Sequence, residues 1–350
     1  LHRYTAGQTV PTGAVVLMPA SPTPVPAASM TAAEREAILA ERAALAPAAV
    51  IITPETASVR DGWQAAAAKL PSAPARATGI PAIASPRATR IAADAASYAA
   101  LLALPAGTPV SFEASTKWGD TPTYTWNAVG QITGSDATLA RQVILLSAHL
   151  DHVGMRENAP GDDKIYNGAD DDASGSVAVL ELAKALAEGP RPKRTIVFAW
   201  FGSEERGGAG SNYFAESPTV QLSRIVANLQ FEMIGRPDPK VAERTLWLTG
   251  YERSNLGAEL AKRGARLVAD PHPDQSFFTR SDNIRFARKG IPAHTVSSFG
   301  LHGDYHQPGD EVAKIDFAHM TEAIQSMLEP IRWLANDQFR PEWAPNGRPR

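Results

Sequence analysis

The chain has 350 residues, a formal net charge of -3 at pH 7, 44% hydrophobic residues and 20% charged residues. This composition is that of a globular protein rather than a disordered or membrane protein, and the length allows two domains with a sizeable core. The small net charge gives no general electrostatic basis for binding nucleic acid or an anionic membrane. Because the chain has no cysteine, disulfides and thiolate ligands are excluded, and any metal ion must be bound by His, Asp or Glu.

No apolar run approaches the roughly 20 residues that a membrane-spanning helix requires. The first residues, Leu1–Tyr4, contain neither an initiator Met nor a signal-peptide pattern. We therefore interpret the sequence as a processed or truncated chain, and we expect a periplasmic or secreted protein.

The first part of the chain is rich in Ala and Pro, and its apolar runs, Pro clusters and helix-capping pattern alternate short strands with helices. The expected elements are, in chain order, a strand at Ala14–Met18, a loop at Pro19–Pro26, a helix from Thr31 to about Leu45, strands at Val50–Ile52 and Gly79–Ile83, and a helix at Ala92–Leu104.

The second part begins near Thr121 and contains four apolar runs typical of buried parallel strands. These runs are Val143–Ala148, Thr195–Phe201, Ile225–Phe231 and Pro292–Ser297. The clearest intervening helix is Ser174–Glu188, which has a broad apolar face. Strands that alternate with helices predict the α/β class, with right-handed crossovers. Gln338–Arg350 is expected to be a polar tail.

The first chemically active motif follows the predicted strand at Val143–Ala148. His149 and Asp151 come at its carboxyl end, where open α/β sheets collect ligands. A lone His would be weak support for a site. In a His-x-Asp pair, however, the Asp can accept the second ring N–H and fix the tautomer that binds metal.

A second motif holds three consecutive acids, Asp170, Asp171 and Asp172, just before the predicted helix at Ser174. Carboxylates at a helix N-terminus would explain one or two of them. Three adjacent carboxylates repel one another unless a cation is present, so the segment favours metal binding.

Two further strands are followed by carboxylates. Glu204 and Glu205 come after Thr195–Phe201. Two adjacent glutamates can have different roles, because one can bind a metal ion while the other accepts a proton from water. Glu232 lies in an otherwise apolar run, where a carboxylate is costly unless it is paired or bound to metal. A structural ion pair with Arg236 is the alternative for Glu232.

The fifth motif follows the predicted strand at Pro292–Ser297 and crowds His302, Tyr305, His306 and several acids into one turn. Taken together, the five motifs supply two His and three carboxylates, which suit a pair of ions such as zinc. A bridging carboxylate would hold two such ions about 3.5–4 Å apart.

At these five motifs the sequence resembles the co-catalytic zinc exopeptidases, which include aminopeptidase Y, bacterial leucyl aminopeptidases and glutamate carboxypeptidase II. The resemblance covers roughly Tyr124–Leu334, with all five segments in order and with compatible gaps. It implies a mostly parallel central sheet flanked by helices, two zinc ions per chain and a peptide substrate that loses its N-terminal residue.

The resemblance also implies a role for each site residue. One zinc would be bound by His149 and Glu232, the other by Glu205 and His306, and both by a bridging Asp171. The remaining roles would be Glu204 as general base, Asp151 as the residue that orients His149, Tyr305 as the donor to the oxyanion, and Asp282 as support for the site. Many relatives carry Asp where Glu232 stands, Asp171 is chosen over its two neighbours by motif alignment only, and His152 and His302 have no assigned role.

The stretch from about Leu1 to Ser115 resembles the protease-associated domain that is often inserted in these enzymes. We therefore expect a protease-associated-like domain at 1–118, a catalytic domain at 119–337 and a tail at 338–350. Relatives with this insert usually have catalytic-domain residues before it, so part of the peptidase domain is expected to be missing from this chain.

Four functions fit the resemblance. The leading hypothesis is an aminopeptidase, because the ligand segments are mostly acidic and favour a free α-ammonium. Arg280, Arg285 or Arg288 could fold into the pocket and favour a carboxypeptidase of the glutamate-releasing type instead. A glutaminyl-cyclase-like acyltransferase would use one zinc, and a receptor-like homologue without activity should have lost ligands that this chain keeps.

Overall fold

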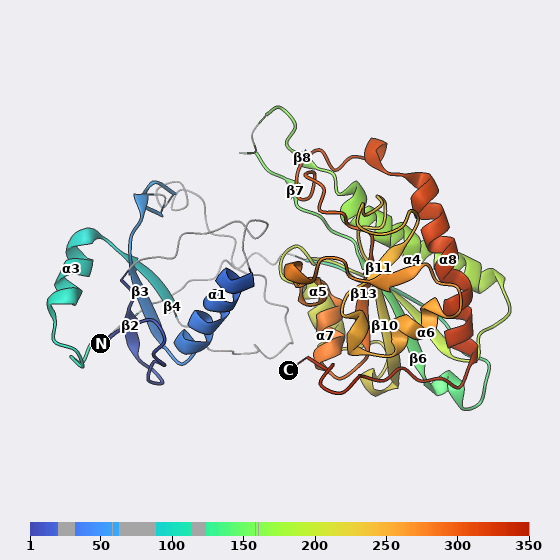
Figure 1. Cartoon of the computed structure of the whole chain (residues 1–350), viewed down its shortest axis with the longest axis horizontal. Helices are drawn as coiled ribbons and strands as arrows, with labels where there is room; N and C mark the ends of the chain where they lie inside the picture. The colour runs from blue at the N-terminus through green and yellow to red at the C-terminus, as the bar shows by residue number, and fades with distance from the viewer. Residues whose placement is uncertain are drawn as a thin grey trace. The chain divides into compact units, whose positions relative to one another are not determined.

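The computed structural model describes residues 1–19, 32–57, 59–62, 89–111, 113, 124–157, 159 and 161–349. The chain divides into two compact units, Leu1–Pro122 and Thr123–Arg350 (Figure 1). The strand predicted at Gly79–Ile83 and all but the first residue of the loop predicted at Pro19–Pro26 lie outside the described residues.

In its described residues the first unit contains a four-stranded parallel sheet with the order β1-β2-β3-β4. Its elements are β1 (His2–Arg3), β2 (Val15–Leu17), α1 (Ala32–Leu45), β3 (Val50–Pro54), β4 (Thr89–Ala93) and α3 (Ala95–Ala103). Because side chains alternate along a strand, β2 and β3 contribute to two small cores, one with Leu45 of α1 and the other with Tyr98 of α3. The two helices therefore cover opposite faces of the sheet.

Helix α3 begins three residues later than the sequence predicts, since Thr89–Ala93 pairs with β3 as a strand. The Ala-rich sequence hides this boundary because Ala has a high helix propensity. The true start is marked by Asp94, whose carboxylate accepts a hydrogen bond from the main-chain nitrogen of Ser97 at 2.8 Å, as an N-cap residue does.

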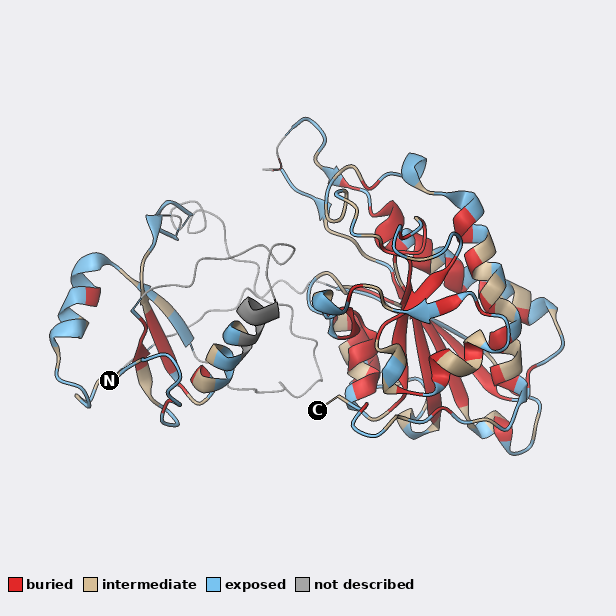
Figure 2. Ribbon diagram, viewed as in Figure 1, coloured by how far each residue is buried: buried red, intermediate tan, exposed pale blue. Residues whose placement is uncertain are grey.

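The second unit contains a seven-stranded mixed sheet with the order β12-β11-β13-β10-β6-β9-β5. The strands are β5 (Ala128–Ile132), β6 (Val143–His149), β9 (Thr195–Phe201), β10 (Ile225–Phe231), β11 (Leu246–Leu248), β12 (Leu267–Ala269) and β13 (Ala293–Ser297). The four predicted strands form the parallel centre, β13-β10-β6-β9, and are almost entirely buried (Figure 2). The predicted α/β class with a mostly parallel sheet is confirmed.

Helices cover both faces of this sheet. On one face α4 (Gly175–Glu188), α6 (Leu256–Ala261) and α8 (Phe317–Asn336) pack on side chains such as Ile144 and Leu146 of β6. On the other face α5 (Ala209–Glu216) and α7 (Asn283–Arg288) pack on the strand side chains that point the opposite way, such as Val143 and Leu145 of β6. None of the described helices is long and apolar enough to cross a membrane.

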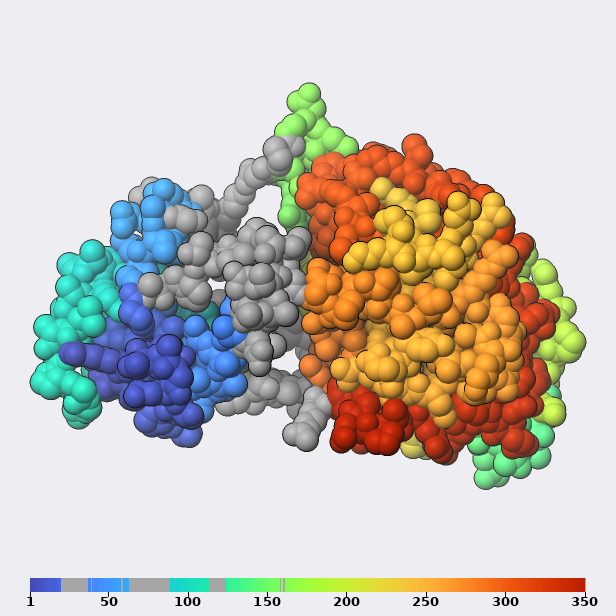
Figure 3. All heavy atoms as spheres, in the orientation of Figure 1, coloured from blue at the N-terminus to red at the C-terminus, as the bar shows by residue number. Residues whose placement is uncertain are grey.

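A two-stranded hairpin, β7 (Gly154–Met155) with β8 (Ile165–Tyr166), follows β6. Figure 3 shows it standing out from the body of the second unit, in green. The hairpin begins immediately after the segment that carries His149 and Asp151.

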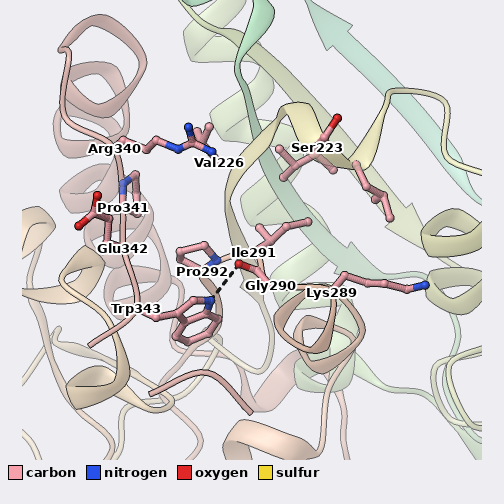
Figure 4. Close-up of a pocket in the computed structure, with 12 residues that line it drawn as sticks. Ser223, Val226, Lys289, Gly290, Ile291, Pro292, Arg340, Pro341, Glu342 and Trp343 are labelled. Carbon is pink, nitrogen blue, oxygen red and sulfur yellow. Dashed lines mark hydrogen bonds between the residues drawn. The ribbon is translucent and has the colours of Figure 1, made fainter. Parts of the chain in front are cut away.

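The residues expected to form a polar tail pack against the second unit. The indole nitrogen of Trp343 donates to the main-chain oxygen of Gly290 at 3.0 Å, and Trp343 contacts the core under α5 and α7. This segment forms one side of a groove of about 530 Å³ at the amino ends of β10 and β13 (Figure 4). Nearby, the buried Arg194 donates to main-chain oxygens of Leu334, Asp337 and Phe339.

Candidate metal centre

Most of the predicted site residues lie at the carboxyl ends of the central parallel strands. His149 is the last residue of β6, Glu204 and Glu205 follow β9, and Glu232 directly follows β10. Neighbouring parallel strands end at the same edge of the sheet, so residues far apart in the sequence meet there. His306 reaches the same place from the loop that follows β13.

The three consecutive acids before α4 have separate surroundings. The carboxylate of Asp170 accepts hydrogen bonds from the main chain of Gly235 at 2.7 Å and from the ring of His302 at 3.0 Å. Asp172 accepts from the main-chain nitrogens of His149, Gly175 and Met233, each at 3.1 Å.

Asp171 instead faces the histidines. Its two carboxylate oxygens lie 3.1 Å from Nε2 of His149 and 3.1 Å from Nε2 of His306. It is therefore the acid of the three that contacts both histidines, and its neighbours, together with His302, hold the backbone in this shape.

Two groups of possible metal ligands share Asp171. One contains His149, Asp171 and Glu232, and the other contains His152, Asp171, Glu205 and His306. Within each group the donor atoms lie within 4.8 Å of one another. All five predicted ligands are thus brought together, and His152 joins them.

The donor set fits zinc, since nitrogen and carboxylate oxygen are ligands that this ion accepts. Two observations support the fit. The Nδ1 atom of His149 donates to the main-chain oxygen of Asp151 at 2.8 Å, so that Nε2 remains available to an ion. Neither buried ring nitrogen of His152 has a hydrogen-bond partner among the described residues, although Nδ1 lies 3.0 Å from Oε1 of Glu205.

Crowding of carboxylates perturbs their protonation. Burial, with the charges of Glu232 and Asp282, raises the pKa of Glu204 to about 9. Burial also raises the pKa of Glu232 to about 7. Burial would lower the pKa of His306, but hydrogen bonds with Asp171 and Glu205 outweigh it and raise the pKa to about 9. Without a bound ion, these groups therefore favour their protonated forms, and a bound cation would offset the same repulsion between carboxylates.

Asp151 contacts His149 through its main chain rather than through its carboxylate. Its main-chain oxygen accepts the hydrogen bond from His149, whereas its carboxylate lies 3.9 Å from that ring. The carboxylate accepts instead from the main-chain nitrogens of Glu204 at 2.8 Å and Glu205 at 3.3 Å. Its side chain thus fixes the turn that presents both glutamates.

The backbone is strained beside several of these residues. Ser203 precedes the glutamate pair with φ 61°, Met233 follows Glu232 with φ 52°, and His306 itself has φ 53°. Non-glycine residues with positive φ are uncommon and cluster at functional sites. These turns aim the adjoining side chains toward Asp171.

Tyr305 and Asp282 adjoin the centre. The Tyr305 ring stacks on His306 with centroids 3.9 Å apart, and its hydroxyl lies 3.4 Å from a guanidinium nitrogen of Arg280. Asp282 is buried, and burial raises its pKa to about 6. The preceding Ser281 donates a hydrogen bond to Glu232.

Two pockets open beside the centre. A small pocket next to Glu232 combines apolar lining residues with polar ones. The apolar residues are Met233, Trp247, Phe277 and Phe299, and the polar ones include Thr249, Arg280, Ser281 and Tyr305. A second pocket of about 300 Å³ is lined by Glu204, Glu205 and Tyr305 and by three arginines, Arg280, Arg285 and Arg288. The sequence alone identifies these arginines as candidates for the pocket but does not show where they lie.

Residues 127–331 match peptidase family M28, and because the match covers more than half of the chain, the chain belongs to this family. It is 28% identical over 249 residues to leucine aminopeptidase 2 of Trichophyton equinum, covering 62% of this chain and 47% of that protein. It is 34% identical over 116 residues to leupeptin-inactivating enzyme 1 of Streptomyces exfoliatus, covering 33% of this chain and 24% of the enzyme. The chain thus spans about half the length of the Trichophyton protein and about a quarter of the length of the Streptomyces enzyme.

The fold is also found among solved structures. A zinc aminopeptidase from Bacillus subtilis superposes with a TM-score of 0.52 and 16% identity, covering 93% of this chain and 71% of that one. At this identity the similarity establishes the fold alone.

Proposed function

We propose that the protein is a metal-dependent exopeptidase that removes N-terminal residues from peptides, with two zinc ions at the centre around Asp171. The observation that carries the proposal is the pair of ligand groups sharing Asp171 beside a glutamate, Glu204, that belongs to neither group. When bound, such ions polarise the scissile carbonyl and make water a better nucleophile.

The chain's own residues would divide the remaining work. Glu204 is positioned by Asp151 through its main-chain nitrogen. Because bound cations would offset the neighbouring charges that raise its pKa, Glu204 would then be able to accept a proton from the attacking water and pass it to the leaving amine. The hydroxyl of Tyr305 would donate a hydrogen bond to the carbonyl oxygen as negative charge develops there. The small pocket beside Glu232 would contact the side chain of the N-terminal residue through its apolar residues.

His149 and Glu232 would hold one ion, and Glu205 and His306 the other. His152 is a further candidate ligand in the second group. The shared Asp171 favours two ions over the single zinc of a cyclase-like enzyme, and a receptor-like homologue without activity would not be expected to keep every ligand. The names of the Trichophyton and Bacillus proteins favour an aminopeptidase and zinc.

The first unit is proposed to be a protease-associated-like domain, with the boundaries 1–118, 119–337 and 338–350 kept as the proposed division of the chain. Its parallel sheet with α1 and α3 on opposite faces is compatible with this assignment. Export to the periplasm or the medium stays a prediction.

The test is a comparison of leucyl-p-nitroanilide, its N-acetylated form and N-acetyl-leucyl-glutamate, each with zinc-loaded and zinc-free protein. We expect zinc-dependent cleavage of the first substrate only. Glu204→Gln should lower kcat at least about 10²-fold with unchanged zinc content, whereas Glu205→Gln should lower zinc content. Cleavage of the acetylated dipeptide alone would replace the proposal with a carboxypeptidase.

A further inference from the structure

Three arginines gather on one side of the candidate metal centre. Arg285 and Arg288 lie one turn apart on α7, and Arg280 precedes that helix. All three line the pocket of about 300 Å³ that also contains Glu204, Glu205 and Tyr305. Guanidinium groups at this spacing repel one another unless an anion lies between them.

The arginines have no carboxylate partner. Among the described residues, no carboxylate oxygen lies within 4.0 Å of any of the three guanidinium groups. Arg285 donates instead to the main-chain oxygen of Gly207 at 3.0 Å, and Arg280 approaches the Tyr305 hydroxyl at 3.4 Å. The Nε atom of Arg285 is buried without a hydrogen-bond partner in the described part of the chain.

Arg236, by comparison, contacts Asp304 at 2.8 Å and Asp310 at 2.9 Å. Three acids share the pocket with the arginines, namely Glu204, Glu205 and Asp282, and Glu205 also lies in a candidate metal-ligand group. Cations bound there would offset the charge of the glutamates, so that Asp282 alone would face three guanidinium groups.

We propose that Arg280, Arg285 and Arg288 form a subsite for a substrate carboxylate on the leaving-group side of the scissile bond. The inference rests on the proposed function. The small pocket and the arginine pocket share Arg280, Ser281 and Tyr305, so they adjoin each other beside the centre. If the small pocket takes the N-terminal side chain, the arginine pocket receives the residue that follows it.

A carboxylate at that position has two sources, the C-terminal carboxylate of a dipeptide and the side chain of Asp or Glu. The planar guanidinium matches either one, because it donates two parallel hydrogen bonds to a carboxylate. The preferred substrates are therefore dipeptides or peptides whose second residue is acidic.

The experiment compares kcat/KM of the zinc-loaded full chain for matched substrates. Leucyl-alanine against leucyl-alanine amide tests the C-terminal carboxylate, and leucyl-glutamate amide against leucyl-glutamine amide tests the acidic side chain. We expect a preference of about tenfold or more for the anionic member of at least one pair, as charge-assisted hydrogen bonds provide. The pair that shows the preference identifies the source.

Two variants and a control assign the preference to this pocket. Arg285→Gln and the more exposed Arg288→Gln should each reduce it, while leucyl-p-nitroanilide is still cleaved. The control is Arg340→Gln, an equal change of charge at an exposed residue of the groove at the opposite end of the sheet, and it should keep the preference.

Cleavage of leucyl-p-nitroanilide without any preference between the pairs would overturn the subsite and leave the proposed function intact. Loss of cleavage for every substrate with a free amine would overturn the proposed function. In that case calorimetric measurement of binding affinities tests the subsite independently of cleavage. Zinc-loaded Glu204→Gln protein should bind leucyl-glutamate more tightly than leucyl-glutamine amide, and adding Arg285→Gln should remove the difference. Equal affinities would overturn the subsite.

Discussion

Asp310 links the loop of His306 to the turn of Asp171, and its replacement by Asn should be costly. Its side chain is fully buried, with carboxylate oxygens 3.1 Å from the main-chain nitrogen of Asp170, 3.0 Å from that of Asp171 and 2.9 Å from Arg236. Removing one partner of a buried ion pair costs about 3–5 kcal/mol. Because Asn keeps one acceptor oxygen, we expect Asp310→Asn to lower the free energy of unfolding by about 3 kcal/mol.

Asp304 supplies a matched control. It contacts the same Arg236 at 2.8 Å and also Lys314 at 2.5 Å, but its side chain is 26% exposed. Water screens such a pair, so Asp304→Asn should cost about 1 kcal/mol or less. Urea unfolding of the zinc-free protein, followed by tryptophan fluorescence with the buried Trp247 as reporter, compares the two variants.

Asp310→Asn should also weaken zinc binding, because the main chain of Asp171 loses its anchor. Outer partners of metal ligands commonly contribute 10–100-fold to metal affinity. Competition with a chromogenic chelator measures the affinity. Equal destabilisation by the two variants, or unchanged zinc affinity in Asp310→Asn, would refute the reasoning that burial makes this acid the anchor of the site.

Three further predictions concern the metals and pH. Chelation should abolish hydrolysis and lower the melting temperature, and added zinc should restore the activity and the melting temperature. The reason is that only the folded chain presents the assembled ligands. A melting temperature that does not change on chelation would contradict this prediction. His152→Ala should reduce the zinc retained per chain after dialysis more than His302→Ala does, since His302 contacts Asp170 outside the ligand groups; equal zinc contents would remove His152 from the candidate ligand set. Burial lowers the pKa of His294 from 6.5 to about 4, so the contribution of its neutral form to stability is fully present above pH 6.5. Up to about 3 kcal/mol of the free energy of unfolding is lost as the pH falls from 6.5 through 4. In urea unfolding of zinc-free protein, His294→Gln should show a shallower loss, and identical pH profiles of the two proteins would argue against this reasoning.

The parallel centre of the sheet could be predicted because each of its strands is a continuous apolar run buried on both faces. β9 and β10 begin and end where the sequence predicts them. Two strands outside this centre, β11 and β12, have three residues each and were not predicted. Such short segments carry too few residues for periodicity to show, and their extended form depends on the pairing of β11 with β13 and of β12 with β11.

The gathering of the ligands could likewise be predicted, because strand ends meet at one edge of a parallel sheet. The division of labour among Asp170, Asp171 and Asp172 could not, since three identical side chains differ only in their distant partners. Gly235, Met233 and Asp310 lie 60 or more residues away along the chain and decide which acid faces the histidines. His152 was not predicted as a candidate ligand for the same reason, because its proximity to Glu205 depends on how the two turns meet.

The packing of the C-terminal segment changes where the folding unit should be considered to end. The match to family M28 stops at residue 331, yet Arg194 obtains its acceptors from residues 334, 337 and 339. A chain cut at the family boundary would leave a buried guanidinium without those acceptors and would remove Trp343 from the core beneath α5 and α7. The domain as a unit of sequence comparison is therefore shorter than the domain as a unit of folding, and expression or engineering of the catalytic part should follow the second definition.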